Sequence, residues 1–236
     1  MTKKLSIIVP VYNENNTLEI IIKKLINLKL YNGTEKEIII IDDFSNDGSR
    51  EIIKNYENNF DIIKAIYKDE NKGKGDSQKL AKQHVTGDYV IIQDADLEYD
   101  PNDYVKLLNK AVNDNEMVVY GSRILNKKNN YSTISFYLGG LLVTFFTNLI
   151  FRNSNLTDQP TCYKLFKSEI IKNINLTSKG FEFCSEVTAK ILKKNINIVE
   201  VPINYYPRKK KDGKKIKWTD GLIALKTLIK CKLIND

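Results

Sequence analysis

Two aspartates separated by a single residue are the most informative chemical feature of the sequence. Asp94 and Asp96 follow a largely apolar run, residues 88–93. In an extended segment, side chains two residues apart point the same way, so both carboxylates can converge on one cation. Carboxylate oxygens suit Mg²⁺ or Mn²⁺, and Mg²⁺ is commonly held by one or two carboxylates together with substrate phosphates. The pattern indicates a nucleoside diphosphate partner, with a solvated, aspartate-rich turn as the alternative.

The elements that must position this pair alternate along the first half of the chain. Runs of β-branched and apolar residues predict strands over residues 5–11, 37–41, 62–67, 89–93 and 117–120. Amphipathic stretches between them predict crossover helices, and this alternation favours a parallel sheet. Because parallel strands place their carboxyl ends along one edge, the polar residues that follow each strand should meet in one crevice.

The second half combines apolar and basic segments. Residues 131–151 carry no charge and are long enough in principle to cross a bilayer. Their Ser, Thr, Gly and Asn residues instead favour a buried helix or a helix lying at a membrane surface. Residues 208–217 hold seven Lys or Arg against one Asp, and residues 220–233 form an amphipathic, basic helical pattern.

Charge and cysteine usage narrow the class of partner. The 236 residues carry a formal net charge of +8, which favours nucleic acid, a phospholipid surface or a phosphorylated substrate. A nucleic-acid-binding module would interleave aromatic residues with its basic ones, yet residues 208–217 contain none, so we expect no nucleic acid partner. Three cysteines without metal-ligand spacing fit a reducing cytosol.

The chain resembles the family-two glycosyltransferases in nine motifs that occur in the same order. They are residues 9–14, 42–49, 71–75, 94–97, 121–123, 158–164, 180–183, 200–203 and 208–216. The most similar branch is the dolichyl-phosphate mannosyltransferase and polyprenyl-phosphate sugar transferase group. The resemblance implies an α/β GT-A fold, in which a Rossmann-like, mostly parallel sheet is flanked by helices, in a single domain with C-terminal amphipathic helices. Residues 1–125 would form the nucleotide-sugar-binding half, and residues 126–236 the acceptor-binding half with membrane-surface helices.

The resemblance also assigns roles to individual residues. The expected donor-binding residues are Pro10, Tyr12, Glu14, Asp42, Asp43, Lys74, Gln93, Asp94, Ala95 and Asp96. Asp94 and Asp96 would bind Mg²⁺ or Mn²⁺, and Glu98 is a third candidate ligand if the strand stays extended. The expected catalytic residues are Asp96, Arg123, Asp158, Arg208 and Lys215.

These roles predict an inverting, metal-dependent glycosyltransferase. It would move a sugar from a GDP- or UDP-sugar onto a polyprenyl phosphate, peripherally on the cytoplasmic, inner face of a membrane, alone or with a partner membrane protein. A phosphate acceptor is already anionic and needs no strong base. One alternative is a saccharide or other hydroxyl acceptor in cell-surface polysaccharide synthesis, for which Asp158 is the candidate base. An alternative of another class is a basic nucleic-acid-binding module.

Overall fold

Strands and helices alternate through the first half of the chain, as the apolar pattern predicts. The computed structural model describes residues 3–131, 133–208 and 215–234. The strands are β1 (Lys4–Val11), β2 (Glu35–Asp42), β3 (Ile63–Tyr67), β4 (Tyr89–Ile92), β5 (Val118–Ser122), β6 (Lys164–Lys167) and β7 (Val199–Pro202). The α-helices are α1 (Asn15–Asn27), α2 (Ser49–Asn59), α3 (Lys74–Ala81), α4 (Tyr104–Asn113), α5 (Ile134–Ile150), α6 (Ser168–Lys172), α7 (Phe183–Lys193) and α8 (Trp218–Leu233). Short 3₁₀ turns are η1 (Tyr31–Gly33), η2 (Lys82–His84) and η3 (Pro101–Asp103).

The strands of the described residues form one seven-stranded sheet in the order β3-β2-β1-β4-β6-β5-β7. The pairs β1–β2, β1–β4, β2–β3 and β5–β7 are parallel. β6 runs antiparallel to both of its neighbours, β4 and β5. The prediction of a mostly parallel α/β sheet is confirmed, but the antiparallel insertion of β6 was not foreseen, because its short run lies next to a polar motif.

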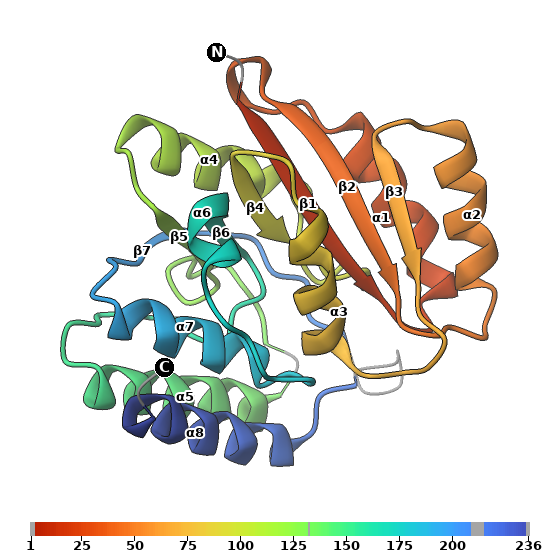
Figure 1. The fold of residues 1–236 in the computed structure, drawn as a ribbon. Coiled ribbons are helices and arrows are strands. Elements are labelled where there is room, and N and C mark those ends of the chain that lie inside the picture. Colours follow the sequence, from red (N-terminus) through yellow and green to blue (C-terminus); the bar gives the residue numbers. More distant parts are fainter. Residues whose placement is uncertain (1–2, 132, 209–214, 235–236) are drawn as a thin grey trace.

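Apolar periodicity accounts for the core. All four residues of β4 are buried, as expected for a strand with both faces covered. In α1, the buried residues Leu18, Ile21, Ile22 and Leu25 recur at helical spacing. Figure 1 shows α1 and α3 on opposite faces of the sheet, so the central strands are enclosed from both sides.

The helices α5, α7 and α8 form a layer next to the sheet, whereas the short α6 contacts β4 and β6. α8 contacts both α5 and α7, and the three helices lie side by side at one end of the molecule (Figure 1). Among the described residues, α5 buries Val143, Thr144 and Thr147, while its opposite side is exposed. No helix in the described ranges is long and apolar enough to traverse a bilayer. The uncharged segment therefore forms a half-covered helix.

Three loops at the carboxyl edge of the sheet contain a residue with left-handed backbone geometry. Asn13 follows β1 with φ 51°, Phe44 follows β2 with φ 67°, and Leu97 lies in the loop after β4 with φ 62°. Such angles are uncommon outside glycine and cost roughly 1–3 kcal/mol each for residues other than Asn or Asp. Strained backbone of this kind clusters at functional sites, and here it lies beside the predicted crevice.

Candidate active site

One cavity collects most of the predicted site residues. Its volume is about 650 Å³, and it lies where the loops after β1, β4 and β5 meet α5 and α8. The predicted residues that line it are Pro10, Tyr12, Glu14, Asp43, Lys74, Asp94, Ala95, Asp96, Glu98, Arg123, Asp158, Arg208 and Lys215. Two predicted donor-binding residues, Asp42 and Gln93, are fully buried outside this lining. Residues 209–214 of the basic run lie outside the described residues.

Gln93 supports the acidic turn, the segment that contains Asp94 and Asp96, from the protein interior. The hydroxyls of Tyr104 and Tyr163 donate to its Oε1 atom at 2.6 and 2.7 Å. Its Nε2 atom donates to the carbonyl oxygen of Asp94 at 2.9 Å. With both ends of the amide satisfied inside the protein, Gln93 supports the start of the acidic turn, and its contact with the donor stays a prediction.

The two aspartates lie in a turn, so strand alternation does not place them. β4 ends at Ile92, and residues 95 and 96 form a turn. Asp94 forms an ion pair with Lys74, and Asp96 Oδ2 accepts a hydrogen bond from Arg208 Nη2 at 2.8 Å. Both residues line the same cavity, so the prediction that they bind one cation stays a prediction that depends on this turn and not on strand alternation.

Negative charge is concentrated around Asp96. Burial, and then the neighbouring carboxylates of Asp94 and Glu98, raise the pKa of Asp96 to about 7, although Arg208 opposes this rise. A divalent cation would relieve the same repulsion, and paired carboxylates are the oxygen ligands that Mg²⁺ and Mn²⁺ prefer. Asp94 and Asp96 thus fit a divalent ion. In the described parts of the chain, no group of three or more His, Cys, Asp and Glu residues is arranged around a metal position.

Glu98 contacts the basic segment. Its Oε1 atom accepts from the backbone N–H of Arg208 at 2.7 Å, and its Oε2 atom accepts from the hydroxyl of Tyr205 at 3.0 Å. The left-handed Leu97 breaks the extended geometry on which the expectation of a third metal ligand depended. The same-face spacing is therefore wrong, and Glu98 anchors the start of the basic run.

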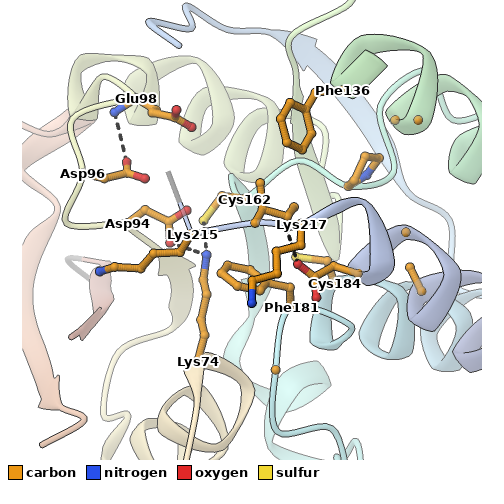
Figure 2. Close-up of a pocket in the computed structure, with 18 of the residues that line it drawn as sticks. Lys74, Asp94, Asp96, Glu98, Phe136, Cys162, Phe181, Cys184, Lys215 and Lys217 are labelled. Atoms are coloured by element: carbon orange, nitrogen blue, oxygen red, sulfur yellow. Dashed lines mark hydrogen bonds and ion pairs between the residues drawn. The ribbon is translucent and has the colours of Figure 1, made fainter. Parts of the chain in front are cut away.

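Lys74 reaches the acidic turn from the opposite side. Figure 2 shows its ammonium pointing at Asp94 and Cys162, beside the ring of Phe181. The distances are 3.8 Å to the sulfur of Cys162 and 5.6 Å to the centre of the Phe181 ring. Burial alone would lower the pKa of Lys74, but the Asp94 carboxylate raises it far above the usual range, so this lysine stays charged.

The geometry of the preceding loop positions Lys74. Gly73 has φ 92°, and a β-carbon there would lie 2.5 Å from the carbonyl oxygen of Lys179. Only glycine fits this approach without displacement of the backbone. The backbone N–H groups of Lys72 and Gly73 donate to the two carboxylate oxygens of Asp43 at 3.0 and 2.8 Å.

Two acidic residues after β2 have different environments. Asp43 lines the cavity and forms an ion pair of 2.5 Å with the buried Lys68. Asp42 instead accepts a hydrogen bond of 2.6 Å from Arg50 Nε and is fully buried. Of the pair, Asp43 is placed to reach a ligand, and Asp42 orders the loop behind it.

Glu14 joins the β1 loop to the basic segment. Its Oε2 atom lies 3.1 Å from Arg208 Nη1, and its Oε1 atom lies 2.7 Å from Lys215 Nζ. The Lys215 ammonium also lies over the Tyr12 ring, 5.5 Å from its centre. Tyr12 is 38% exposed, so its ring is available for stacking.

Arg123 and Asp158, which also line the cavity, are joined by three hydrogen bonds. Asp158 Oδ2 accepts from the Arg123 backbone N–H at 2.8 Å and from Nε at 2.7 Å, and Oδ1 accepts from Nη2 at 2.7 Å. The guanidinium lies 5.1 Å from the centre of the Tyr205 ring. Both oxygens of Asp158 are therefore engaged by a permanent cation.

Sequence reasoning missed several supporting residues. Lys68 and Tyr205 had been given no role, yet each contacts a cavity carboxylate. Glu200 lies in the motif at residues 200–203, for which the sequence predicted no role. In the structure it accepts hydrogen bonds from the Thr157–Asp158 turn. The motif containing Glu200 was the available signal, whereas nothing local marks Lys68.

Comparison with protein families gives an extended match. The model described as "Glycosyl transferase family 2" matches residues 6–174. A UDP-N-acetylglucosamine–dolichyl-phosphate N-acetylglucosaminyltransferase from Methanococcus voltae is 32% identical over 219 residues, covering 85% of this chain and 85% of that protein. The dolichyl-phosphate beta-glucosyltransferase ALG5A of Trichomonas vaginalis is 27% identical over 246 residues, covering 98% of this chain and 73% of the relative.

Solved structures share the fold at low sequence identity. Glucosyl-3-phosphoglycerate synthase from Mycobacterium tuberculosis, in complex with Mn²⁺, UDP-glucose and phosphoglyceric acid, has a TM-score of 0.72 and 15% identity. The match covers 99% of this chain and 81% of that structure. This similarity establishes a GT-A-like fold for the chain.

Proposed function

The chain belongs to glycosyl transferase family 2 and is a glycosyltransferase, and we propose that it moves a hexose-type sugar from a GDP- or UDP-sugar to a polyprenyl phosphate. The proposed reaction inverts the anomeric centre and takes place at the cytosolic surface of a membrane. The name of the Methanococcus voltae relative gives UDP-N-acetylglucosamine as its donor and dolichyl phosphate as its acceptor. A UDP-sugar is therefore the first donor to test.

The acidic end of the cavity is suited to the donor. Tyr12 can stack on the nucleobase, and Asp43 can accept hydrogen bonds from the base or the ribose. Asp94 and Asp96 would hold a divalent ion against the diphosphate. When bound, that ion supplies charge neutralisation for the departing nucleoside diphosphate. Lys74 adds a positive charge next to Asp94.

The pairing of Arg123 with Asp158 is the observation that carries the choice of acceptor. A hydroxyl acceptor needs a base, and Asp158 is the candidate that the sequence offers. Because Arg123 engages both of its oxygens, Asp158 is poorly placed to take a proton. A phosphate acceptor needs no base, and it benefits from a guanidinium held in a fixed orientation.

The proposed chemistry needs few protein groups. A phosphate oxygen of the acceptor attacks the anomeric carbon and forms a new C–O bond, while the bond from that carbon to the donor diphosphate breaks and its electron pair leaves with the nucleoside diphosphate. Arg123, Arg208 and Lys215 would reduce the repulsion between the two anionic reactants. In the ligand-free arrangement, Arg208 and Lys215 instead neutralise Asp96 and Glu14.

The membrane part of the proposal rests on the outer sides of α5 and α8. Ile134 and Phe145 on α5 are 77% and 61% exposed, and Trp218 and Leu233 on α8 are 74% and 76% exposed. Exposed apolar side chains on two helices that contact each other favour an interaction surface, and a membrane-surface helix buries such side chains at the headgroup boundary. Since α5 and α8 also line the cavity, a polyprenyl chain in the bilayer would place its phosphate near Arg123.

A transfer assay tests the proposal directly. The protein is incubated with Mn²⁺ and radiolabelled UDP- or GDP-sugars, with either a polyprenyl phosphate or a saccharide as acceptor. We expect label in the lipid fraction and only slow hydrolysis without acceptor. Transfer to saccharides alone would overturn the acceptor assignment and leave the family membership intact.

A further inference from the structure

Arg123 depends on a single carboxylate for its orientation. Three of its N–H groups donate to Asp158, and its ring contact is with Tyr205. Within the described residues, no hydrogen bond is made by its Nη1 atom, which leaves that atom for a ligand. The direction in which the guanidinium presents its free N–H groups is therefore set by the position of Asp158.

Asp158 is in turn held from strand β7. The Oε1 atom of Glu200 accepts from the backbone N–H of Asp158 at 3.0 Å. The Oε2 atom accepts from both the backbone N–H and the hydroxyl of Thr157, each at 2.7 Å. Both carboxylate oxygens of Glu200 are used, and all of these donors belong to the one turn that carries Asp158.

The same turn is also fixed to strand β5, which leads into Arg123. The hydroxyl groups of Thr157 and Ser122 lie 2.6 Å apart. β5 and β7 are parallel neighbours, with Tyr120 opposite Glu200 and Ser122 opposite Pro202. Glu200 is not one of the described residues that line the cavity, so it reaches the site only through the turn. Two adjacent strands thus clamp one short segment.

We propose that Glu200 is a positioning residue for acceptor capture, which holds the Thr157–Asp158 turn so that Arg123 points into the cavity. This inference rests on the proposed function, since it assigns Arg123 to the acceptor phosphate. It makes a prediction that a purely structural role does not. Loss of the Glu200 contacts should weaken acceptor binding selectively, whereas a general loss of stability would affect the donor and the acceptor alike.

The first experiment compares the same change, glutamate to glutamine, at Glu200 and at a control position, with farnesyl phosphate as a short polyprenyl phosphate acceptor. In Glu200→Gln, one acceptor oxygen becomes an NH₂ group that faces a backbone N–H, so half of the clamp is lost. We expect the KM for farnesyl phosphate to rise about tenfold, which corresponds to the loss of one charged hydrogen bond. The value of kcat and the donor KM should stay within about twofold.

The matched control is Glu37→Gln on strand β2. Glu37 is also a carboxylate whose oxygens accept several hydrogen bonds, from Ser6 and Thr86, but it has no link to Arg123. Its substitution should lower the melting temperature without changing the KM for farnesyl phosphate. Equal effects of the two substitutions on acceptor KM would overturn the proposal.

A double-mutant cycle then tests whether Glu200 acts through Arg123. In an Arg123→Ala background, Glu200→Gln should change the acceptor KM by less than about twofold, because the group it positions is absent. Additive effects would contradict the proposal. If Glu200→Gln does not fold, Thr157→Val and Thr157→Ser replace it: the valine variant should raise the acceptor KM and the serine variant should restore it.

The outcomes also separate this inference from the function on which it rests. If the unmodified protein transfers no sugar to farnesyl phosphate or to longer polyprenyl phosphates, the proposed function fails. If it does transfer sugar and Glu200→Gln has an unchanged acceptor KM, only the positioning role fails.

Discussion

The guanidinium of Arg208 lies 2.8 Å from the carboxylate of Asp96, and so joins the segment after β7 to the acidic turn after β4. The same guanidinium lies 3.1 Å from Glu14. A cation from the second half of the chain thus neutralises carboxylates from the first half, in the place where a metal-bound diphosphate is proposed to sit. We expect the bound donor and metal ion to compete with these ion pairs for the same charged groups.

Replacement of Arg208 should separate its contribution to turnover from its competition with a metal ion for Asp96. In Arg208→Ala we expect kcat/KM to fall about 10²–10³-fold, because a cation beside the reacting phosphates is lost. Mn²⁺ binding, measured by electron paramagnetic resonance, should be unchanged or tighter, since Asp96 no longer has a competing partner. Arg152→Ala, at an exposed arginine outside the cavity, is the control. Weaker Mn²⁺ binding in Arg208→Ala would contradict this account.

The acidic turn should be needed for turnover and for metal binding. Asp94→Asn and Asp96→Asn are each expected to lower kcat about 10³-fold or more. The reason is that a metal ion acting as a Lewis acid lowers the activation barrier by several kcal/mol. EDTA should abolish transfer, and Mn²⁺ should restore it. Asp61→Asn, at an exposed aspartate, should behave like the unmodified protein. Full turnover in the presence of EDTA would rule out the metal-dependent mechanism.

Glu37 should make stability depend on acidic pH. Burial would raise its pKa, but hydrogen bonds from Lys4, Ser6 and Thr86 outweigh this effect and lower the pKa to about 2. A lowered carboxyl pKa stabilises the fold above the unfolded value near 4.5 and loses this effect as the pH falls toward 2. Glu37→Gln should therefore reduce the free energy of unfolding by about 1–3 kcal/mol at pH 7. Urea titrations should find that this difference shrinks between pH 4.5 and pH 2.

Membrane binding should depend on the outer sides of α5 and α8. We expect the protein to sediment with vesicles that contain phosphatidylglycerol, and less with phosphatidylcholine alone, because the chain has a net charge of +8. Phe145→Ser combined with Trp218→Ser should weaken binding about tenfold or more, since two apolar side chains lose their burial in lipid. Ile20→Ser removes an exposed apolar side chain from α1 and is the control. Equal binding of all variants would remove the interface from the proposal.

Gly73 should be much less tolerant of a side chain than Gly33. Both have positive φ, at 92° and 67°, but a β-carbon at Gly33 would meet nothing within 4 Å. Gly33→Ala is expected to cost about 1 kcal/mol of unfolding free energy from backbone strain. Gly73→Ala adds the clash with Lys179 and should cost about 2–4 kcal/mol. It should also weaken donor binding, which calorimetry can measure with UDP and Mn²⁺. Similar costs at both glycines would argue against the close approach.

The sequence predicted the frame of the site better than its fine geometry. The strands of the first half appear within a few residues of their expected positions, because apolar and β-branched residues dominate most of them, and the central strand β4 is buried along its whole length. The carboxyl-edge rule then placed Tyr12, Asp43, Lys74 and Arg123 around one cavity. Both inferences depend on patterns that are local in the chain.

Contacts between distant residues were beyond such patterns. The antiparallel β6, the pairing of Lys68 with Asp43, and the support of Asp158 by Glu200 all join segments far apart in sequence. Local backbone geometry also misled the expectation for Glu98, since the left-handed Leu97 turns the chain away from the strand direction. Nothing in the residue type of leucine signals that conformation.

The place of β6 in the sheet has a consequence for how this chain can be assembled or recombined. β5 ends at Ser122, but it cannot be joined to β4 until β6, which begins at Lys164, arrives between them. A ribosome that has released only β1 to β5 therefore presents an open strand edge on β4, a known template for misassembly. A chimera joined before β6 would need a foreign strand whose register matches the host β4 and β5, whereas a junction after Lys167 keeps the host β6 in place.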